Sequence, residues 1–176
     1  MTVDLRFHDG RRALEMLEEL AGLYERVYAE PPYDSAPKFS RARFLQRTRD
    51  QAQAPGFVLV TARREENLLG LAFGFSMAAG SWWAAASPPP RSILGAPKLA
   101  VIELIVEGTE RGQGLGHALL DALLKDRPES FAILAAVIEA DAYGWYLRNG
   151  WRKVAEFRVE PPYSDALILD LRQTPG

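Results

Sequence analysis

The sequence predicts an α+β fold in which helices flank a mixed β-sheet. The first observation is a set of stretches that alternate in polarity or are apolar throughout, as strands are. They cover residues 2–8, 57–62, 68–77, 99–106, 131–138, 151–159 and 166–171. The second is an apolar spacing of three and four residues, typical of helices, at residues 10–30, 40–51, 115–126 and 140–149. The third is the order of these elements, which does not repeat a βαβ unit.

The N-terminal elements are a strand and a long helix. Residues 2–8 alternate between apolar and polar side chains, and Asp9 is a suitable N-cap for the helix that follows. One face of this helix carries Leu14, Leu17, Leu20, Tyr24 and Val27. Pro31 and Pro32 end the helix near Glu30, because proline cannot continue it. A second helix is expected over residues 40–51.

The middle of the chain predicts a hairpin and a long loop. The polar residues 64–67 separate two strand-like stretches and indicate a turn. Residues 79–98 form one long irregular segment with Trp82, Trp83 and three consecutive prolines. A loop of this length inside a compact domain is usually functional or disordered. Further on, Gly150 is a suitable C-cap residue for the helix 140–149.

Length and composition bound the function. The 176 residues favour a single domain, residues 1–176, with an ordinary globular balance of 48% hydrophobic and 25% charged residues. A net charge of −2 gives no reason to expect nucleic acid or a membrane as partner. The absence of cysteine excludes disulfides, cysteine nucleophiles and thiolate metal sites, and fits a cytoplasmic protein. We expect no metal site, no signal peptide and no transmembrane segment.

The run Arg111-Gly112-Gln113-Gly114-Leu115-Gly116 connects an apolar strand-like stretch to a helix-like one that begins with His117. Glycines lack the Cβ atoms that would keep a ligand from the backbone, and a helix N-terminus offers unpaired N–H groups. The turn therefore predicts a site for phosphate or pyrophosphate. A P-loop would need Lys and Ser or Thr after its last glycine, and a dinucleotide fold would need glycine where His117 stands.

Two motifs resemble the GNAT acetyltransferase superfamily, which uses acetyl coenzyme A. Its cofactor motif reads Arg or Gln, two residues, Gly, one residue, Gly or Ala, and Arg111, Gly114 and Gly116 match it. The preceding strand has the family register at Leu104 and Val106, with Gly108 in place of the usual loop proline.

The second signature reads Ala, two residues, an apolar residue, Tyr, three residues, Gly and an aromatic residue. It is matched by Ala142, Trp145, Tyr146, Gly150 and Trp151. Glu139 occupies the position of an Asn often found in the family. The order of elements resembles the family over nearly the whole chain, whereas the specific motifs cover residues 99–151.

The resemblance implies a mostly antiparallel sheet flanked by helices and an acetyl-CoA-dependent N-acetyltransferase. Pantetheine would lie along the strand, and the pyrophosphate would rest on the amides of residues 111–116. The expected cofactor-binding residues are Leu104, Ile105, Val106, Arg111, Gly112, Gln113, Gly114, Leu115, Gly116 and His117. The amine would attack the thioester directly, so no acyl-enzyme is needed.

Two residues are candidates for proton transfer. Glu103 interrupts an apolar strand, where a charge must be paired, face a cleft or have a shifted pKa. It is the candidate base for an amine that arrives protonated, and a salt bridge or an exposed edge position is the alternative. Tyr146 resembles the general acid of the family, and the alternative is a core tyrosine packed beside Trp145 and Trp151.

The acceptor is expected to be a small primary amine, because the chain has no charged tail and the loop 79–98 is rich in aromatic residues. Trp82, Trp83 and Tyr33 are candidates for its pocket. A non-catalytic acetyl-CoA sensor and a protein N-terminal or lysine acetyltransferase are the alternatives. Homodimers are common in the superfamily, and Trp82 and Trp83 are equally suited to an interface.

Overall fold

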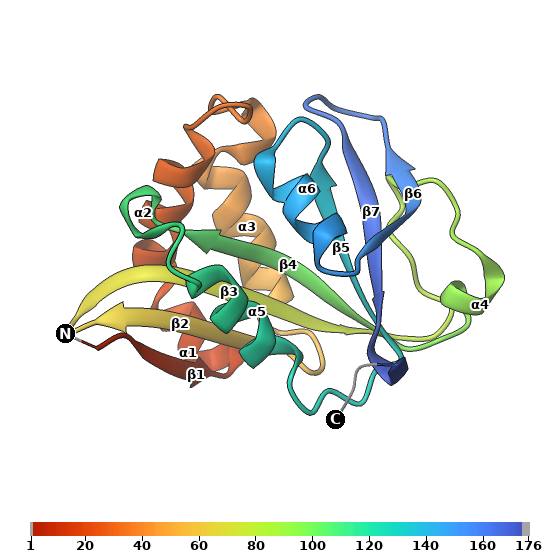
Figure 1. Cartoon of the computed structure of the whole chain (residues 1–176), viewed down its shortest axis with the longest axis horizontal. Coiled ribbons are helices and arrows are strands. Elements are labelled where there is room, and N and C mark those ends of the chain that lie inside the picture. Colours follow the sequence, from red (N-terminus) through yellow and green to blue (C-terminus); the bar gives the residue numbers. More distant parts are fainter. Residues whose placement is uncertain (1, 174–176) are drawn as a thin grey trace. The chain divides into compact units, whose positions relative to one another are not determined.

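The computed structural model describes residues 2–173 (Figure 1). These residues form two compact units. The first unit comprises residues 2–30, 34–75 and 101–126, and the second comprises residues 31–33, 76–100 and 127–173. The residues with proposed chemical roles are divided between them, since Glu103 and the glycine turn belong to the first unit and Tyr146 to the second.

Within the described residues, seven strands form a sheet in the order β1-β2-β3-β4-β5-β7-β6. They are β1 (Asp4–His8), β2 (Val58–Arg64), β3 (Asn67–Met77), β4 (Lys98–Val106), β5 (Phe131–Val137), β6 (Arg152–Phe157) and β7 (Ser164–Asp170). The pairs β1–β2, β2–β3, β5–β7 and β6–β7 are antiparallel, whereas β4 and β5 are parallel. This confirms the mixed, mostly antiparallel sheet.

The helices lie close to the predicted positions. They are α1 (Gly10–Glu15), α2 (Leu17–Tyr28), α3 (Arg41–Gln51), α4 (Arg91–Leu94), α5 (Leu115–Leu124) and α6 (Asp141–Arg148), with 3-10 turns η1 (Pro37–Phe39), η2 (Gly108–Glu110) and η3 (Leu171–Gln173). The Asp9 carboxylate accepts a hydrogen bond from the Arg12 amide at 2.9 Å, which confirms Asp9 as the N-cap of α1.

The prediction of one helix over residues 10–30 is wrong, because Met16 separates α1 from α2. Its φ and ψ of −103° and 2° are not helical, and its amide bonds the Ala13 carbonyl at 3.0 Å. At Gly10, the carbonyl oxygen of Ala52 stands 1.8 Å from where a Cβ atom would be. The start of α1 is therefore packed directly on the end of α3.

The core of the first unit lies between the strands and the helices α1, α2 and α3. Leu17, Leu20, Tyr24 and Val27 of α2 are buried as predicted. The last three of these residues form one cluster with Phe44 of α3 and, on the strands, Leu59, Leu71, Phe73 and Ile105. The hairpin turn at residues 64–67 is also confirmed, because β2 and β3 pair Arg64 with Asn67.

Helix α5 covers the other face of the strands in the first unit (Figure 1). Leu119 and Leu123 of the predicted apolar stripe are buried, and Leu115 is half-buried. A Cβ atom on Gly70 of β3 would come within 2.9 Å of the Leu119 side chain and 3.0 Å of the Ile105 carbonyl oxygen. Glycine at this position therefore permits the close packing that fixes the start of α5.

In the second unit, α6 ends as predicted, since Gly150 has a φ of +92° and its amide bonds the Leu147 carbonyl at 3.3 Å. The prediction that residues 79–98 are wholly irregular is wrong, because the segment contains α4 and the first residue of β4. That residue, Lys98, is fully buried, and its Nζ donates to the carbonyl oxygens of Ile93, Leu94 and Ala96 at 3.2, 3.1 and 2.7 Å. The ammonium group thereby satisfies carbonyl groups at the end of α4.

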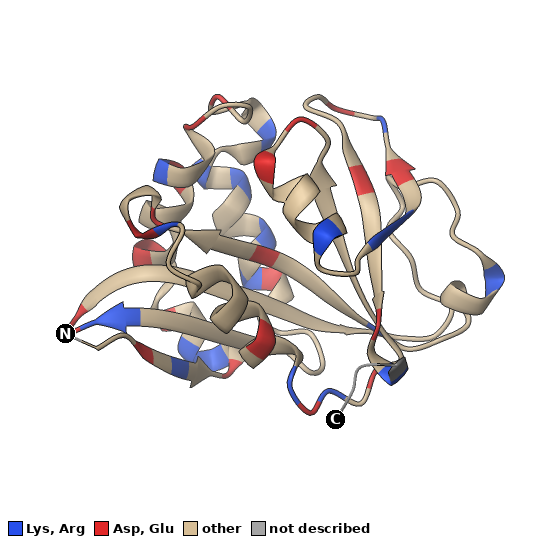
Figure 2. Cartoon of the chain, in the orientation of Figure 1, with Lys and Arg blue, Asp and Glu red and all other residues tan. Residues whose placement is uncertain are grey.

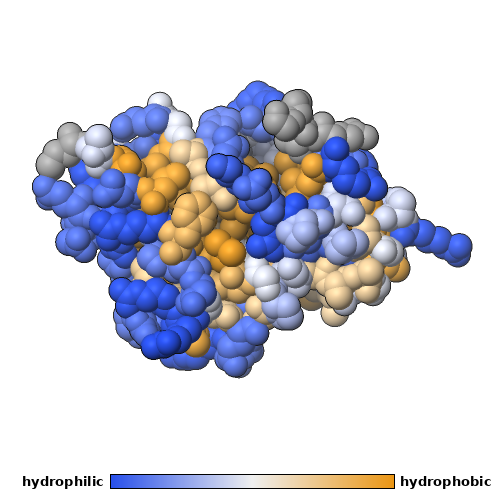
Figure 3. All heavy atoms as spheres, turned by 90° about the horizontal axis from the view of Figure 1, so that it is seen from below, coloured by the Kyte–Doolittle hydropathy of each residue, from blue (hydrophilic) through white to orange (hydrophobic). Residues whose placement is uncertain are grey.

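Basic and acidic residues are interspersed along the ribbon in Figure 2. Apolar atoms reach the surface among hydrophilic ones on the face shown in Figure 3. In the first unit the large exposed apolar side chains include Phe7 of the edge strand β1, which is 61% exposed, and its neighbour Val3. Among the described residues, none of the helices combines the length and the hydropathy of a membrane span.

Candidate active site

The predicted glycine turn, residues 111–116, follows η2 and includes the first two residues of α5. Gly112 and Gly114 have φ values of +78° and +83°, in the left-handed region that favours glycine. A Cβ atom at Gly112, Gly114 or Gly116 would have no heavy atom within 4 Å, so the turn borders open space. The Ala118 amide bonds the Gly114 carbonyl at 3.1 Å, and the amides before it belong to the helix N-terminus. These residues fit a phosphate-bearing group.

Arg111 braces the entrance of this turn. Its Nη1 and Nη2 each donate to the Glu30 carboxylate at 2.7 Å, and its Nε donates to the Val106 carbonyl at 3.1 Å. The hydrogen bond from Arg111 lowers the pKa of Glu30. The side chain thereby joins the glycine turn to the residues that follow α2 and to the end of β4.

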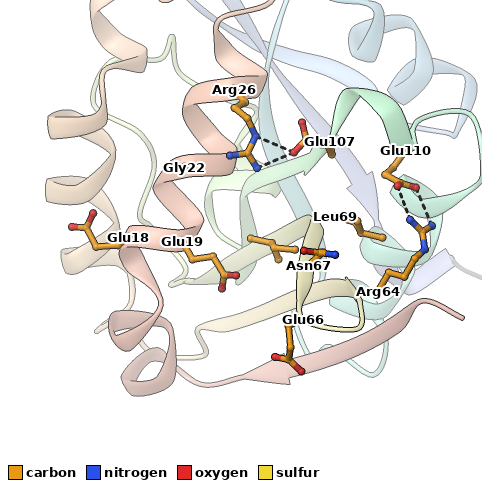
Figure 4. Close-up of a pocket in the computed structure, with 11 residues that line it drawn as sticks. Glu18, Glu19, Gly22, Arg26, Arg64, Glu66, Asn67, Leu69, Glu107 and Glu110 are labelled. Carbon is orange, nitrogen blue, oxygen red and sulfur yellow. Dashed lines mark hydrogen bonds and ion pairs between the residues drawn. The ribbon is translucent and has the colours of Figure 1, made fainter. Parts of the chain in front are cut away.

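Two more ion pairs hold the loop between β4 and the turn (Figure 4). Arg26 of α2 binds Glu107 with its Nη2 at 2.8 Å, and Arg64 of β2 binds Glu110 with its Nη1 at 2.7 Å. These pairs line a hollow of about 530 Å³ between α2, the β2–β3 hairpin and the loop. Its other charged lining residues are Glu18, Glu19 and Glu66. This excess of carboxylates disfavours phosphate, so the hollow is distinct from the glycine turn in its chemistry.

The remaining predicted cofactor residues flank the turn. Ile105 is buried, whereas Leu104 and Val106 are half-buried on β4. Gln113 and His117 are exposed on either side of the half-buried Leu115.

Glu103 of β4 is buried, with 7% of its surface exposed, and a single hydrogen bond reaches its carboxylate among the described residues. The donor is the Tyr28 hydroxyl, 2.8 Å from Oε2. Gln51 is the one described residue that has a fully buried side-chain oxygen or nitrogen without a partner. The Oε1 atom of Glu103 therefore keeps some contact with solvent. One oxygen of the carboxylate is thus held by Tyr28, and the other accepts no hydrogen bond among the described residues.

Few neighbouring groups stabilise the negative charge of the ionised Glu103 carboxylate. Burial raises the pKa of its carboxyl to about 7, and the hydrogen bond from Tyr28 and the charge of Arg47 offset this only in part. Arg47 of α3 is bonded elsewhere, to the Tyr24 hydroxyl at 3.0 Å and to the Lys38 carbonyl at 3.1 Å. A pKa near neutrality suits a group that takes up and releases protons at physiological pH.

Tyr28 and Arg47 are residues of this site that the sequence did not reveal. The contact between Tyr28 and Glu103 joins residues 75 positions apart. The sequence signal for Tyr28 is its position four residues after Tyr24, next to the predicted apolar face of α2.

Tyr146 of α6 is buried in the second unit, with 7% of its surface exposed. Its ring meets Trp145 and Trp151 edge-on, with centroids 5.1 and 5.6 Å apart. These ring contacts are those expected of a core tyrosine. The burial also shields the hydroxyl from bulk water, which is compatible with the role of a general acid.

The three predicted acceptor residues are half-buried in the second unit. Trp82 and Trp83 lie with ring centroids 5.3 Å apart, and Trp83 contacts Phe157 of β6 at the same distance. The Trp82 indole N–H donates to the Ser87 carbonyl at 2.9 Å. Both tryptophans therefore pack the loop, and Tyr33 stands in the short segment after α2.

A second buried carboxylate, Asp165 of β7, is surrounded differently. It accepts hydrogen bonds from the Tyr143 hydroxyl at 2.6 Å and from Arg158 at 2.8 Å, and Lys153 lies 3.6 Å away. Burial raises the pKa of Asp165, but the two hydrogen bonds and the charges of Lys153 and Arg158 outweigh it, so the pKa falls below its usual value. Burial, together with the hydrogen bond to Asp165 and its charge, raises the pKa of Tyr143 to about 12.

Comparisons with known proteins agree with this fold. The sequence profile of the Acetyltransferase (GNAT) family matches residues 11–151. No curated protein sequence matches the chain significantly. The chain belongs to the acetyltransferase (GNAT) family, which confirms the resemblance found in the two motifs.

Solved structures with similar folds include acetyltransferases at low identity. PaiA N-acetyltransferase from Thermoplasma acidophilum, in complex with coenzyme A, has 13% identity and a TM-score of 0.64 over 97% of this chain and 99% of its own. NAA60 from Arabidopsis thaliana, in complex with acetyl-CoA, has 16% identity and a TM-score of 0.68 over 97% and 99%. Aminoglycoside N-acetyltransferase AAC(6')-Iy, in complex with CoA, has 15% identity and a TM-score of 0.56 over 90% and 92%. At these identities the likeness establishes the fold.

Proposed function

We propose that the protein is an N-acetyltransferase that transfers the acetyl group of acetyl-CoA to a primary amine of a small molecule. The observation that carries the proposal is the open glycine turn at the N-terminus of α5, in a chain of the acetyltransferase (GNAT) family. Solved relatives in complex with CoA or acetyl-CoA support the choice of cofactor. Acetyl-CoA would supply the activated acetyl group as a thioester.

The cofactor would be held by the backbone of residues 111–116, with its phosphates at the positive end of α5. The three ion pairs of Arg26, Arg64 and Arg111 keep the entrance of the turn in place before the cofactor arrives. Each pair contributes little stability alone, but pairs to α2, to β2 and to Glu30 restrict the loop from several sides. We infer that the turn is preorganised, which lowers the entropy lost on binding.

Glu103 would accept the proton of the incoming ammonium, directly or through water, so that a neutral amine attacks. A backbone N–H near Ile105 or Val106 would stabilise the negative charge that develops on the carbonyl oxygen. Tyr146 would give its hydroxyl proton to the departing thiolate and regain one from the nitrogen of the forming amide. Holding both substrates in register supplies much of the acceleration.

Substitution of Gly116 tests the cofactor site without straining the fold. Gly116 lies inside α5, has no positive φ and no neighbour within 4 Å of an added Cβ atom. Gly116→Ala should therefore raise the free energy of unfolding by about 0.5–1 kcal/mol, as alanine does in a helix. If phosphates approach this backbone, the same variant should bind acetyl-CoA at least tenfold more weakly in a calorimetric titration.

Gly22→Ala is the matched control, because Gly22 is also helical and its added Cβ atom would lie 3.6 Å from the flexible end of Arg26. It should gain similar stability and leave acetyl-CoA affinity unchanged. Wild-type protein at 100 times the Kd should gain about 2.7 kcal/mol of stability. Equal affinity of wild type and Gly116→Ala for acetyl-CoA would contradict the assignment of the glycine turn as the cofactor site.

The acceptor class is decided by a screen that follows CoA thiol release with small amines and with peptides that have free N-termini or lysines. Small amines as the better substrates would support the proposal. Preference for peptides would assign the protein to the N-terminal or lysine acetyltransferases. One-site binding of acetyl-CoA with no transfer to any amine would identify a sensor. A cytoplasmic location and a homodimer remain predictions, and sedimentation analysis tests the latter.

A further inference from the structure

The last turn of α2 points to a role for a residue outside the family motifs, and the inference rests on the proposed function. We propose that Tyr28 is a positioning residue that holds the Glu103 carboxylate in the orientation in which it accepts the proton of the amine. The contact that carries the proposal is the hydrogen bond of 2.8 Å from the Tyr28 hydroxyl to Glu103 Oε2. This leaves Oε1 as the atom that receives the proton.

The ring of Tyr28 is fixed on both sides. It contacts the Tyr24 ring with centroids 4.3 Å apart, and it stacks on Phe39 of η1 at 4.6 Å with an angle of 25° between the planes. The Lys38 ammonium lies 5.3 Å from the Phe39 centroid. A tyrosine packed in this way can adopt few rotamers, so the position of its hydroxyl group is restricted.

The backbone around Tyr28 is anchored as well. The Ser35 amide donates to the Tyr28 carbonyl at 2.9 Å, and the Asp34 amide donates to the Glu30 carbonyl at 3.1 Å. The Glu30 side chain is bound to Arg111 at the cofactor turn. The end of α2 thus contacts the candidate base through Tyr28, and Glu30 just after it contacts the cofactor turn. The positions of the base and the turn are therefore both tied to the same segment.

Three charged or titratable side chains face Glu103 from the helices packed on this part of β4. Tyr28 and Tyr24 come from α2, and Arg47 comes from α3. Tyr28 bonds the carboxylate, whereas the Tyr24 hydroxyl accepts a hydrogen bond from Arg47. The two tyrosines therefore differ in their partner while sharing a helix and an aromatic cluster, so Tyr24 provides the matched control.

Tyr28→Phe keeps the ring and removes the hydrogen bond that stabilises the ionised carboxylate. We expect the pKa of Glu103 to rise by about one unit, and the acidic limb of the pH profile of kcat to move up by the same amount. The plateau above that limb should fall several-fold, with the KM for acetyl-CoA unchanged. Tyr24→Phe should move the limb by less than a third as much.

The experiment combines pH–rate profiles with a nuclear magnetic resonance titration of the protein labelled with 13C at the glutamate carboxyls, with Glu103→Gln identifying the resonance. A shift of the Glu103 midpoint in Tyr28→Phe but not in Tyr24→Phe supports the proposal. An unchanged midpoint in Tyr28→Phe, or equal shifts in both variants, overturns it. If the wild type transfers no acetyl group, the proposed function fails, and the titration alone still decides whether Tyr28 sets the state of Glu103.

Discussion

The two units each contain a buried strand carboxylate that accepts a tyrosine hydroxyl, and the rest of their surroundings differ. Asp165 also accepts a hydrogen bond from Arg158 and forms an ion pair with Lys153, so its pKa is lowered. Among the described residues no lysine or arginine forms an ion pair with Glu103, and its pKa rises to about 7. Two cations thus compensate the charge of Asp165, whereas Glu103 has one hydrogen bond, from Tyr28, and the charge of Arg47. A buried group held in this way stabilises little and is suited to proton transfer.

The largest expected effect is the loss of activity in Glu103→Gln. Glutamine is nearly isosteric and its carbonyl oxygen can still accept from Tyr28, but it cannot take up a proton. We expect kcat/KM for the amine to fall 10²–10³-fold at pH 8, in the range typical of a lost general base. Steady-state kinetics with the best amine of the screen measure it. A loss below threefold would leave Glu103 as a structural residue.

The same substitution should stabilise the protein, since it removes a buried charge. The usual pKa of glutamate is 4.5 and that of Glu103 is about 7, so between these values the folded chain retains a proton that the unfolded chain has released. The free energy of unfolding of the wild type therefore falls as the pH rises from about 4.5 to 7. Relative to Glu103→Gln, this loss amounts to about 3 kcal/mol at pH 8.

Urea unfolding of both proteins at pH 5 and pH 8 measures this difference. The stability advantage of Glu103→Gln should grow with pH. A constant difference across that interval would mean that Glu103 does not titrate there.

Asp165→Asn should have the opposite sign. Its ionised carboxylate stabilises the fold above the usual pKa of aspartate, and that contribution is lost as the pH falls through the lower folded value. At pH 7 the substitution leaves Arg158 and Lys153 without their buried anion, and we expect a loss of about 2 kcal/mol in thermal or urea unfolding. Unchanged stability would show that Arg158 and Lys153 do not stabilise the fold through Asp165. It would then contradict the difference in charge compensation between Asp165 and Glu103.

The smallest expected effect is that of Tyr146→Phe, which tests whether the second unit takes part in the proton transfer. The ring contacts with Trp145 and Trp151 survive the change, so stability should fall by less than about 1 kcal/mol. If the hydroxyl protonates the thiolate, kcat should fall about tenfold with acetyl-CoA affinity unaltered. Full turnover in the variant would make Tyr146 a packing residue.

Much of the fold and the conformation of the glycine turn could be predicted, because their determinants are local in sequence. Apolar periodicity located the strands and most helices, and glycines at every second position marked the turn before α5. The break at Met16 was missed, since neither a proline nor a glycine marks it in the sequence.

The surroundings of the candidate site are set by distant residues, and the sequence could not supply them. Glu103 stood out as a charge inside an apolar strand, but its partner Tyr28 lies 75 residues away. Asp165 did not stand out, because the last strand was expected to begin at residue 166 and the structure begins it at Ser164. The ion pairs of Arg26, Arg64 and Arg111 likewise join separate elements.

The most direct measurement is the titration of Glu103 itself by 13C nuclear magnetic resonance of the wild-type protein, which needs no knowledge of the acceptor. The account predicts a carboxyl resonance with a midpoint near pH 7 that is absent from Glu103→Gln. A midpoint for Glu103 near the usual 4.5 would contradict the account, because the carboxylate would then be as well compensated as Asp165 and no longer poised to take a proton at neutral pH.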